Sequence, residues 1–298
     1  MIIYTVHKGN NMSLVTKQVD DHEMILDIHD GGISNVLYRV GHRERVFMSI
    51  LRNEVNKDMT VIDLGANIGY TTLIMCKNVG DGRVYAIEPD PHNIDILTKN
   101  IEHNNYKDAC KITQAAIDKE DGNLEFWIAS APNLNSVQKT KNSIRKIDVP
   151  AMSLPSFIEK EMDGAYPNFI KMDIEGHEVS VFEGALDYFT DNPGSTKILM
   201  EVHPQFYNEE NNFENILTEY MKIGFNCKYV VSTPVSQPRL FAERGYKPKH
   251  EISTDGFVRG FYDTVSNEDL VEFACKQHEE GSSKKIVRSF MIERESNA

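Results

Sequence analysis

Residues 61–73 read VIDLGANIGYTTL, and this stretch decides the fold. The apolar run that ends at Asp63 is typical of a buried parallel strand, and the residues after Gly69 have helical character. Gly65 and Gly69 lie in the short connection, where the lack of a side chain allows a sharp turn and close approach of a ligand. Ligands of open α/β sheets bind at the carboxyl ends of the strands, so the stretch predicts a ligand site at this turn.

The spacing of the glycines discriminates between nucleotide cofactors. A dinucleotide-binding G-x-G-x-x-G turn that began at Gly65 would need glycine at positions 67 and 70, where this chain has Asn67 and Tyr70. The observed pattern is D-x-G-x-N-x-G. Asn adopts positive φ more readily than most residues, so the turn is retained with Asn in the middle. A nicotinamide dinucleotide is therefore disfavoured.

A second motif, YAIEPDP at residues 85–91, follows the next predicted strand. Glu88 closes that strand 23 residues after Gly65. Doubly wound sheets place an acidic residue at this position, where it accepts hydrogen bonds from both ribose hydroxyls. The two motifs together predict a site for a ligand that carries a ribose.

The wider pattern predicts a doubly wound α/β domain. From residue 59 onward, buried apolar runs alternate with helical segments, which indicates βαβ units and a mostly parallel sheet. The polar stretch 130–145 is a candidate loop over a site. We expect an N-terminal β-rich addition at 1–44, a core domain at 45–265, and a C-terminal extension at 266–298 with a helix and a strand.

The N-terminal addition is expected to be a small antiparallel element. Residues 13–41 alternate weakly, and the pair Gly31–Gly32 predicts a turn between two strands. Residues 42–56 have the apolar spacing of a helix.

Composition limits the classes of partner. The chain has 298 residues, with 40% hydrophobic and 26% charged residues, as in ordinary soluble globular proteins. Its formal net charge of -13 disfavours nucleic acids and anionic membrane surfaces. No apolar stretch reaches the ~20 residues of a membrane span, and the N-terminus lacks the apolar core of a signal peptide. The four cysteines fit reduced thiols, so we expect a cytoplasmic protein.

Four segments together resemble the FkbM-type methyltransferases. They are DLGANIGYTTL at 63–73, AIEPDP at 86–91, KMDIEGHE at 171–178 and MEVHP at 200–204. The resemblance covers about residues 45 to 205 and implies S-adenosylmethionine as the cofactor. It also implies a seven-stranded class I methyltransferase sheet, Rossmann-like, and O-methylation of sugars or natural products.

The resemblance sets the expected cofactor residues. Enzymes of this kind line the adenine pocket after the third strand, where this chain has QAAIDKEDG at 114–122. The full expected set is Asp63, Gly65, Asn67, Gly69, Glu88, Ala116, Ile117 and Asp118.

Three residues at two later strand ends are the catalytic candidates. Asp173 follows a buried strand, and Glu201 and His203 close the next one, two positions apart and so on one face. Either His203 or Asp173 acts as a general base, or Asp173 and Glu201 hold a hard divalent ion such as Mg²⁺ that acidifies the acceptor hydroxyl. Glu175 and Glu178 fit both a site role and the simpler role of partners for a helix N-terminus.

The leading interpretation is methyl transfer to a hydroxyl of a sugar, glycan or glycosylated small molecule. The N-P-P-Y or D-P-P-Y signature of many amino-methylating enzymes is missing, because the corresponding strand ends in MDIEGHE. The alternatives are an N-methyltransferase and a non-catalytic methyltransferase-like interaction module. The oligomeric state is left open.

Overall fold

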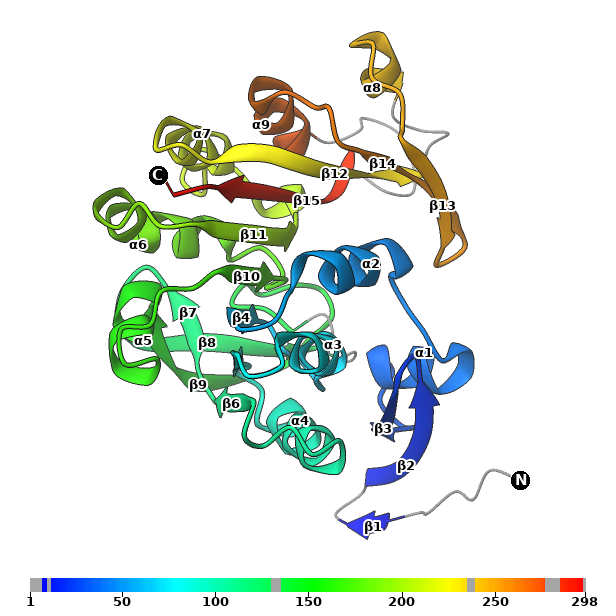
Figure 1. Ribbon diagram of the computed structural model, residues 1–298. Coiled ribbons are helices and arrows are strands. Elements are labelled where there is room, and N and C mark those ends of the chain that lie inside the picture. Colours follow the sequence, from blue (N-terminus) through cyan, green and yellow to red (C-terminus); the bar gives the residue numbers. More distant parts are fainter. Residues whose placement is uncertain (1–6, 10–11, 130–134, 235–238, 277–284, 297–298) are drawn as a thin grey trace. The chain divides into compact units, whose positions relative to one another are not determined.

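The computed structural model describes residues 7–9, 12–129, 135–234, 239–276 and 285–296 (Figure 1). The chain forms two compact units. Unit 1 comprises residues 1–116 and 122–151, and unit 2 comprises residues 117–121 and 152–298. The domain boundaries expected after residues 44 and 265 stay a prediction.

Unit 1 begins with a three-stranded antiparallel sheet in the order β1-β2-β3. Its strands are β1 (His7–Gly9), β2 (Met12–Val19) and β3 (His22–Asp27). The sheet is antiparallel, as expected for this segment, but the turn between β2 and β3 lies at Asp20, which has φ 48°. The expected strand after Gly31–Gly32 is wrong: helix α1 (Ile33–Val40) comes next, because Leu37 is buried one helical turn after Ile33.

Three parallel strands with alternating helices form the cofactor-motif part of unit 1. After α2 (Arg45–Glu54), which the spacing of 42–56 predicted, come β4 (Thr60–Leu64), α3 (Tyr70–Val79), β5 (Arg83–Ile87), α4 (Pro91–His103) and β6 (Cys110–Thr113). β4 pairs with β5, and β5 with β6, all parallel. Helix α4 begins at Pro91, and the Asp90 side chain caps it by accepting a hydrogen bond from the His92 amide.

An antiparallel pair completes unit 1. Strand β7 (Ala116–Asp118) leads into β8 (Gly122–Ala129), which pairs with β9 (Ser143–Ser153). One face of this pair packs Phe126, Ile128 and Val149 into an apolar cluster with Ala116. The loop expected at 130–145 is in part strand β9, and residues 130–134 lie outside the described residues.

Unit 2 contains six neighbouring strands in the order β13-β14-β12-β15-β11-β10 (Figure 1). In chain order its elements are α5 (Leu154–Glu161), β10 (Phe169–Met172), α6 (Glu178–Asp191), β11 (Thr196–Glu201), η2 (Pro204–Phe206), α7 (Phe213–Lys222), β12 (Asn226–Pro234), α8 (Arg239–Glu243), β13 (His250–Thr254), β14 (Phe257–Tyr262), α9 (Asn267–Cys275) and β15 (Val287–Arg294).

The chain's last strand lies inside this sheet rather than at its edge. β10 and β11 are parallel, whereas β15 runs antiparallel between β11 and β12. Arg294, at the end of β15, is buried and donates hydrogen bonds to the carbonyls of Phe189 and Asn192 at 2.7 and 2.8 Å. Its guanidinium lies over the rings of Phe189 and Phe225. The tail therefore helps to complete the core of unit 2.

Strands and helices alternate in both units, so the α/β prediction is confirmed, with a mixed sheet of parallel and antiparallel pairs. The strand count of seven and the two additions stay predictions. Among the described helices, none is long and apolar enough to cross a membrane.

Candidate functional site

The turn after β4 has the backbone geometry that its sequence predicts. Gly65, Asn67 and Gly69 all have positive φ, at 76°, 50° and 93°. A Cβ on Gly69 would lie 2.7 Å from Leu97 Cδ1, so a side chain at this position would collide with helix α4. The turn is anchored from the neighbouring strand, since the amides of Gly65 and Ala66 both donate to the Ile87 carbonyl at 3.0 Å.

Asp63 lies beneath this turn and is fully buried. Its Oδ2 accepts hydrogen bonds from the Thr71 and Thr72 hydroxyls at 3.0 and 2.7 Å. The carboxylate thus joins the end of β4 to the first turn of α3. Because Asp63 is fully buried, its carboxylate contacts the turn from beneath and holds α3 against the end of β4.

Glu88 closes β5 and contacts the same turn. Its Oε2 accepts the amide of Asn67 at 2.9 Å, and its Oε1 accepts the amide of Asp90 at 3.0 Å and Asn93 Nδ2 at 3.2 Å. Burial raises the pKa of Glu88 to about 7, against these hydrogen bonds, which favour the charged form. A carboxylate offers about four acceptor positions, so Glu88 retains capacity for a ligand hydroxyl beside the turn.

The three residues expected at the adenine pocket lie on β7 and differ in surroundings. Ala116 packs into the apolar cluster of the β8–β9 pair, and Ile117 is buried. Asp118 accepts a hydrogen bond from His177 Nε2 at 2.8 Å. Burial would raise the pKa of Asp118, but the His177 contact outweighs it and the pKa is lowered. Asp118 and His177 both belong to unit 2, so Asp118 is a carboxylate with a defined partner within its own unit.

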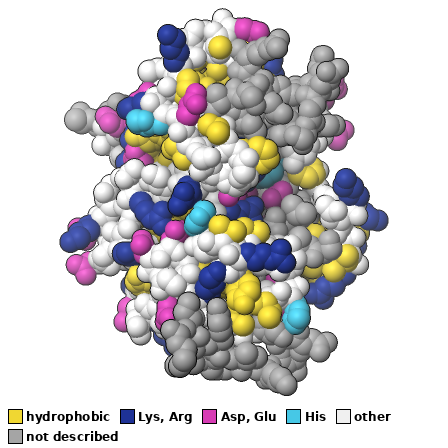
Figure 2. All heavy atoms as spheres, turned by 90° about the vertical axis from the view of Figure 1, so that its right-hand side faces the viewer, with side chains coloured by type: hydrophobic (Ala, Val, Ile, Leu, Met, Phe, Trp, Pro, Cys, Tyr) yellow, Lys and Arg dark blue, Asp and Glu magenta, His cyan; other side chains and the backbone are white. Residues whose placement is uncertain are grey.

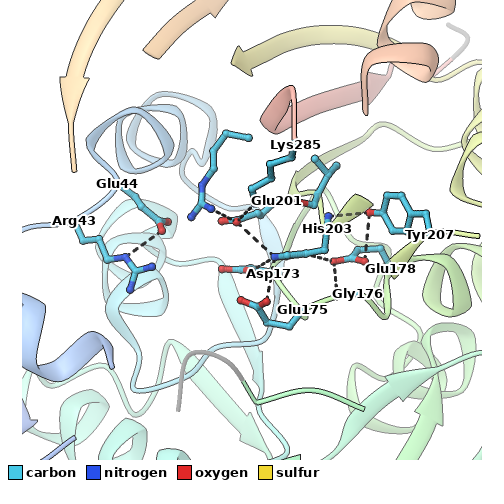
Figure 3. Close-up of polar contacts among 12 residues, drawn as sticks. Arg43, Glu44, Asp173, Glu175, Gly176, Glu178, Glu201, His203, Tyr207 and Lys285 are labelled. Carbon is cyan, nitrogen blue, oxygen red and sulfur yellow. Dashed lines mark hydrogen bonds and ion pairs between the residues drawn. The ribbon is translucent and has the colours of Figure 1, made fainter. Parts of the chain in front are cut away.

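The ends of β10 and β11 bring together a cluster of four carboxylates around one imidazole (Figure 3). His203 Nε2 lies 3.4 Å from Glu175 Oε2, 3.5 Å from Glu201 Oε1 and 3.9 Å from Asp173 Oδ1. On the other side of the ring, Nδ1 lies 2.6 Å from Glu178 Oε1. The structure thus places the predicted residues Asp173, Glu201 and His203 side by side.

The carboxylates around His203 favour its protonated form. Burial alone would lower its pKa, but the charge of Glu178 and the hydrogen bond to it, with Glu201 and Glu175 beyond, raise that pKa well above the usual value. An imidazolium has no lone pair with which to accept a proton. The geometry thus argues against His203 as the general base and for a role in stabilising the carboxylates.

Glu178 and Tyr207 hold the His203 imidazole in place through hydrogen bonds. Glu178 is fully buried at the first residue of α6, and its Oε1 also accepts the Gly176 amide at 3.1 Å. Tyr207 Oη donates to Glu178 Oε2 at 3.4 Å and accepts the His203 amide at 3.1 Å. Sequence reasoning left Glu178 between capping and function, because its partner His203 lies 25 residues further along the chain.

Glu201 is held by two cations from the end of the chain. Lys285 Nζ and Arg288 Nη1 both bind its Oε1, and Lys285 also donates to the Val202 carbonyl at 3.0 Å. Although burial would raise the pKa of Glu201, Arg288 and Lys285 keep it well below the usual value. Nothing in the sequence around 285–288 indicated this contact, which forms only when β15 pairs with β11.

Glu175 precedes Gly176 in a strained turn. Glu175 has φ 48° and Gly176 φ 95°, and a Cβ on Gly176 would lie 2.3 Å from Phe206 Cδ2. Burial raises the pKa of Glu175 to about 7, partly offset by His203. A non-glycine residue at positive φ costs of order 1 kcal/mol, and such residues cluster at functional sites.

The ligand atoms of Asp173, Glu201 and His203 lie within 4.8 Å of one another, as those of a metal site would. Their charges do not fit a hard divalent ion. Glu201 already binds two cations, and His203 would have to lose a proton to become a ligand. Imidazole is also a poor ligand for Mg²⁺.

The fold, the D-x-G-x-N-x-G turn and the buried Glu88 define a methyltransferase of the S-adenosylmethionine-dependent class. The family model described as the methyltransferase FkbM domain matches residues 63–231, more than half of the chain. The chain therefore belongs to the FkbM methyltransferase family, as its motifs indicated.

Curated relatives are distant. Methyltransferase 1 of Beauveria bassiana is 23% identical over 149 residues, which covers 44% of this chain and 59% of the relative. The hexuronic acid methyltransferase AglP of Haloferax volcanii is 27% identical over 142 residues, covering 47% and 56%. The chain thus spans less than two thirds of the length of these relatives.

Solved structures resemble the chain only broadly. Methyltransferase FkbM from Methylobacillus flagellatus has a TM-score of 0.41 at 17% identity, covering 69% of this chain and 43% of that protein. TYW2 of M. jannaschii in complex with AdoMet has a TM-score of 0.43 at 13% identity, covering 97% and 89%.

Proposed function

We propose that this chain is a cytoplasmic enzyme that transfers a methyl group from S-adenosylmethionine to a hydroxyl oxygen of a sugar, glycan or glycosylated small molecule. The observation that carries the proposal is the carboxylate cluster around His203, which offers proton acceptors and hydrogen-bond acceptors suited to a hydroxyl. The name of AglP, a hexuronic acid methyltransferase, supports a sugar acceptor.

The cofactor residues we propose are those of the glycine turn with Glu88 and β7. Gly65, Asn67 and Gly69 give this turn its positive-φ backbone, which would let the cofactor approach closely, and Asp63 joins β4 to the start of α3. Glu88 would accept hydrogen bonds from the ribose hydroxyls. We further propose that Ala116, Ile117 and Asp118 border the adenine. When bound, the cofactor would supply a methyl group on a sulfonium sulfur. That sulfur leaves readily as a neutral thioether.

Asp173 is the group we propose to receive the acceptor proton. Its side chain is 33% exposed, more than those of Glu175, Glu178, Glu201 and His203. The Asp173 carboxylate would accept the proton that the acceptor hydroxyl loses during methyl transfer. A general base of this kind contributes roughly 10²–10⁴-fold to the rate.

His203 and Glu201 would act through Asp173 and not on the acceptor. Both are almost fully buried, with side-chain exposures of 3% and 5%. The imidazolium of His203 supplies positive charge beside Asp173, and Glu201 is fixed by Lys285 and Arg288. We therefore assign them as positioning residues, with His203 as the positive charge beside Asp173 and Glu201 as a fixed partner of His203.

The test is a turnover assay with labelled S-adenosylmethionine and a panel of neutral sugars, uronic acids and nucleotide sugars. We expect a product heavier by one methyl group, which NMR places on oxygen. A methyl group found on nitrogen would favour the N-methyltransferase alternative. Cofactor binding by calorimetry without turnover of any acceptor would favour the interaction-module alternative.

A further inference from the structure

Helix α4 carries two buried asparagines on the face that packs against the glycine turn. Asn93 and Asn100 are seven positions apart, so they lie on the same side of the helix, and they are 1% and 0% exposed. A Cβ on Gly69 would lie 2.7 Å from Leu97 Cδ1 and 3.9 Å from Asn100 Cβ, so this side of α4 lies directly against the turn. Both amides lie beneath the surface, apart from the exposed basic and acidic side chains that are interspersed on the face in Figure 2.

The first of these asparagines contacts Glu88. Asn93 Nδ2 donates to Glu88 Oε1 at 3.2 Å. Among the residues that the structure describes, none donates a hydrogen bond to Asn93 Oδ1, although that atom is buried. A buried carbonyl oxygen without a donor is costly, and reversal of the amide would place the same oxygen against the Glu88 carboxylate. The orientation of the Asn93 amide is therefore explained by its donation to Glu88.

The second asparagine contacts the glycine turn. Asn100 Nδ2 donates to the Ile68 carbonyl at 2.8 Å, and Ile68 lies between Asn67 and Gly69, which both have positive φ. The same side chain also binds the backbone of Ile25 in β3, since Nδ2 donates to its carbonyl at 3.1 Å and Oδ1 accepts its amide at 2.6 Å. One buried amide thus joins α4, the N-terminal sheet and the turn.

The start of α4 is fixed beside Glu88 through Asp90. The Asp90 amide donates to Glu88 Oε1 at 3.0 Å, and Asp90 Oδ1 accepts the His92 amide at 2.9 Å. Asp90 Oδ2 accepts Asn135 Nδ2 at 2.7 Å, from the connection between β8 and β9. A shift of α4 relative to Glu88 would break these contacts, so the helix holds Asn93 at a fixed position.

We infer that Asn93 and Asn100 are positioning residues for the cofactor, Asn93 by orienting the Glu88 carboxylate and Asn100 by holding the glycine turn in its positive-φ conformation. The inference rests on the proposed function in one respect, that S-adenosylmethionine binds at Glu88 and this turn. Groups that already have the bound conformation lose less conformational freedom on binding, which increases affinity.

The Asn93 role is tested by the pH dependence of cofactor affinity. Burial raises the pKa of Glu88 to about 7, and the hydrogen bond from Asn93 acts against that rise. In Asn93→Leu, the pH below which S-adenosylmethionine affinity falls should therefore move upward by about one to two units, and affinity should recover at higher pH. Calorimetric titration of the parent and the variant measures this shift. A residue that only stabilised the fold would leave that pH unchanged.

The Asn100 role is tested by affinity at constant pH dependence. Asn100→Leu should bind S-adenosylmethionine about two- to tenfold more weakly at every pH, because it loosens the turn but leaves the contacts of Glu88 intact. Asn78→Leu on α3 is the matched control. It loses hydrogen bonds to the carbonyls of Arg52 and Val55 at 3.0 and 3.3 Å and should bind as the parent does.

Thermal unfolding establishes that each variant is folded at the temperature of the titration. Asn93→Ser and Asn100→Ser, which add no bulk, replace a leucine variant that does not fold and carry the same expectations. An unchanged pH dependence in the Asn93 variant, or parent affinity in the Asn100 variant, would overturn the inference.

The outcomes also distinguish this inference from the proposed function. If the protein methylates a hydroxyl but both variants bind S-adenosylmethionine as the parent does, the proposed function stands and the positioning roles are rejected. If the variants behave as expected but the methyl group is transferred to nitrogen, the proposed acceptor is rejected and the positioning roles remain. If the parent does not bind S-adenosylmethionine, both are rejected.

Discussion

His203 Nδ1 lies 2.6 Å from Glu178 Oε1, and this buried contact joins the end of β11 to the first residue of α6. Glu178 is fully buried and His203 is 2% exposed, so little water screens the charges of this pair. Each partner holds the other in its ionised form: the pKa of Glu178 is lowered despite burial, and that of His203 is raised despite burial. The contact orders the turn that contains Glu175 and Gly176.

Removal of one charge from this pair should destabilise the protein strongly. Glu178→Gln leaves a buried imidazolium without its main partner, which typically costs about 3–5 kcal/mol of unfolding free energy. The matched control is Glu183→Gln on the same helix, where an exposed pair with Lys119 is worth less than about 1 kcal/mol. Thermal unfolding measures both. Equal melting temperatures for the two variants would refute the assignment of a buried ion pair.

The pH dependence of this stabilisation has two limits. The pKa of His203 is raised in the folded protein. Its contribution to stability is therefore complete below pH 6.5 and is lost as the pH rises through the raised pKa. The pKa of Glu178 is lowered in the folded protein. Its contribution to stability is therefore complete above pH 4.5 and is lost as the pH falls through the lowered pKa. The difference in unfolding free energy between the parent protein and Glu178→Gln should therefore be largest between pH 4.5 and pH 6.5.

Asp173→Asn should separate catalysis from cofactor binding. The substitution keeps the shape of the side chain but removes its ability to accept a proton, so turnover should fall roughly 10²–10⁴-fold. The dissociation constant of S-adenosylmethionine should stay within about twofold, since the proposed cofactor residues are others. Asp187→Asn, on the exposed face of α6, is the control. Normal turnover of the Asp173→Asn enzyme would require a different proton acceptor, for which Glu175, the next most exposed carboxylate of the cluster, is the candidate.

Treatment with EDTA should leave turnover unchanged. The cations that compensate Glu201 are Lys285 and Arg288, which a chelator does not remove. The measurement is the initial rate before and after chelation, followed by addition of Mg²⁺ or Mn²⁺. Loss of activity in EDTA with recovery on addition of Mg²⁺ would show that the charge argument is wrong and would restore the metal mechanism expected as an alternative from the sequence.

The local parts of the site were predictable from the sequence, and the long-range parts were not. The positive φ of Asn67 follows from its place between two glycines, and Glu88 from its place at a strand end. Each depends on a few neighbouring residues. The contact of Glu201 with Lys285 spans 84 residues and depends on the insertion of β15 beside β11. No periodicity in either segment encodes that strand order.

The incorrect turn at Gly31–Gly32 has a similar origin. Two glycines favour a turn, but they do not determine whether a strand or a helix comes after it. The β2–β3 turn formed instead at two aspartates, where Tyr70 Oη donates to Asp20 Oδ2 at 2.5 Å. That partner comes from α3, 50 residues away, so this turn is stabilised by a tertiary contact that no local pattern encodes.

Cofactor affinity should depend on pH through Glu88. Its pKa in the protein is about 7, and the ionised form is the better acceptor for ribose hydroxyls. Binding should therefore release a proton below that pH, so affinity should be constant above about pH 7 and should fall toward a limit of about tenfold per pH unit well below it. Calorimetric titrations at several pH values, in buffers of different ionisation enthalpy, measure both the affinity and the protons released.

Glu88→Gln should bind S-adenosylmethionine about ten- to a hundred-fold more weakly at alkaline pH and should lose the pH dependence. Glu102→Gln, a carboxyl of α4 that pairs with Lys107 at the surface, should behave as the parent. If the parent binds S-adenosylmethionine with the same affinity on both sides of neutrality, or if Glu88→Gln binds as well as the parent, Glu88 does not contact the ribose.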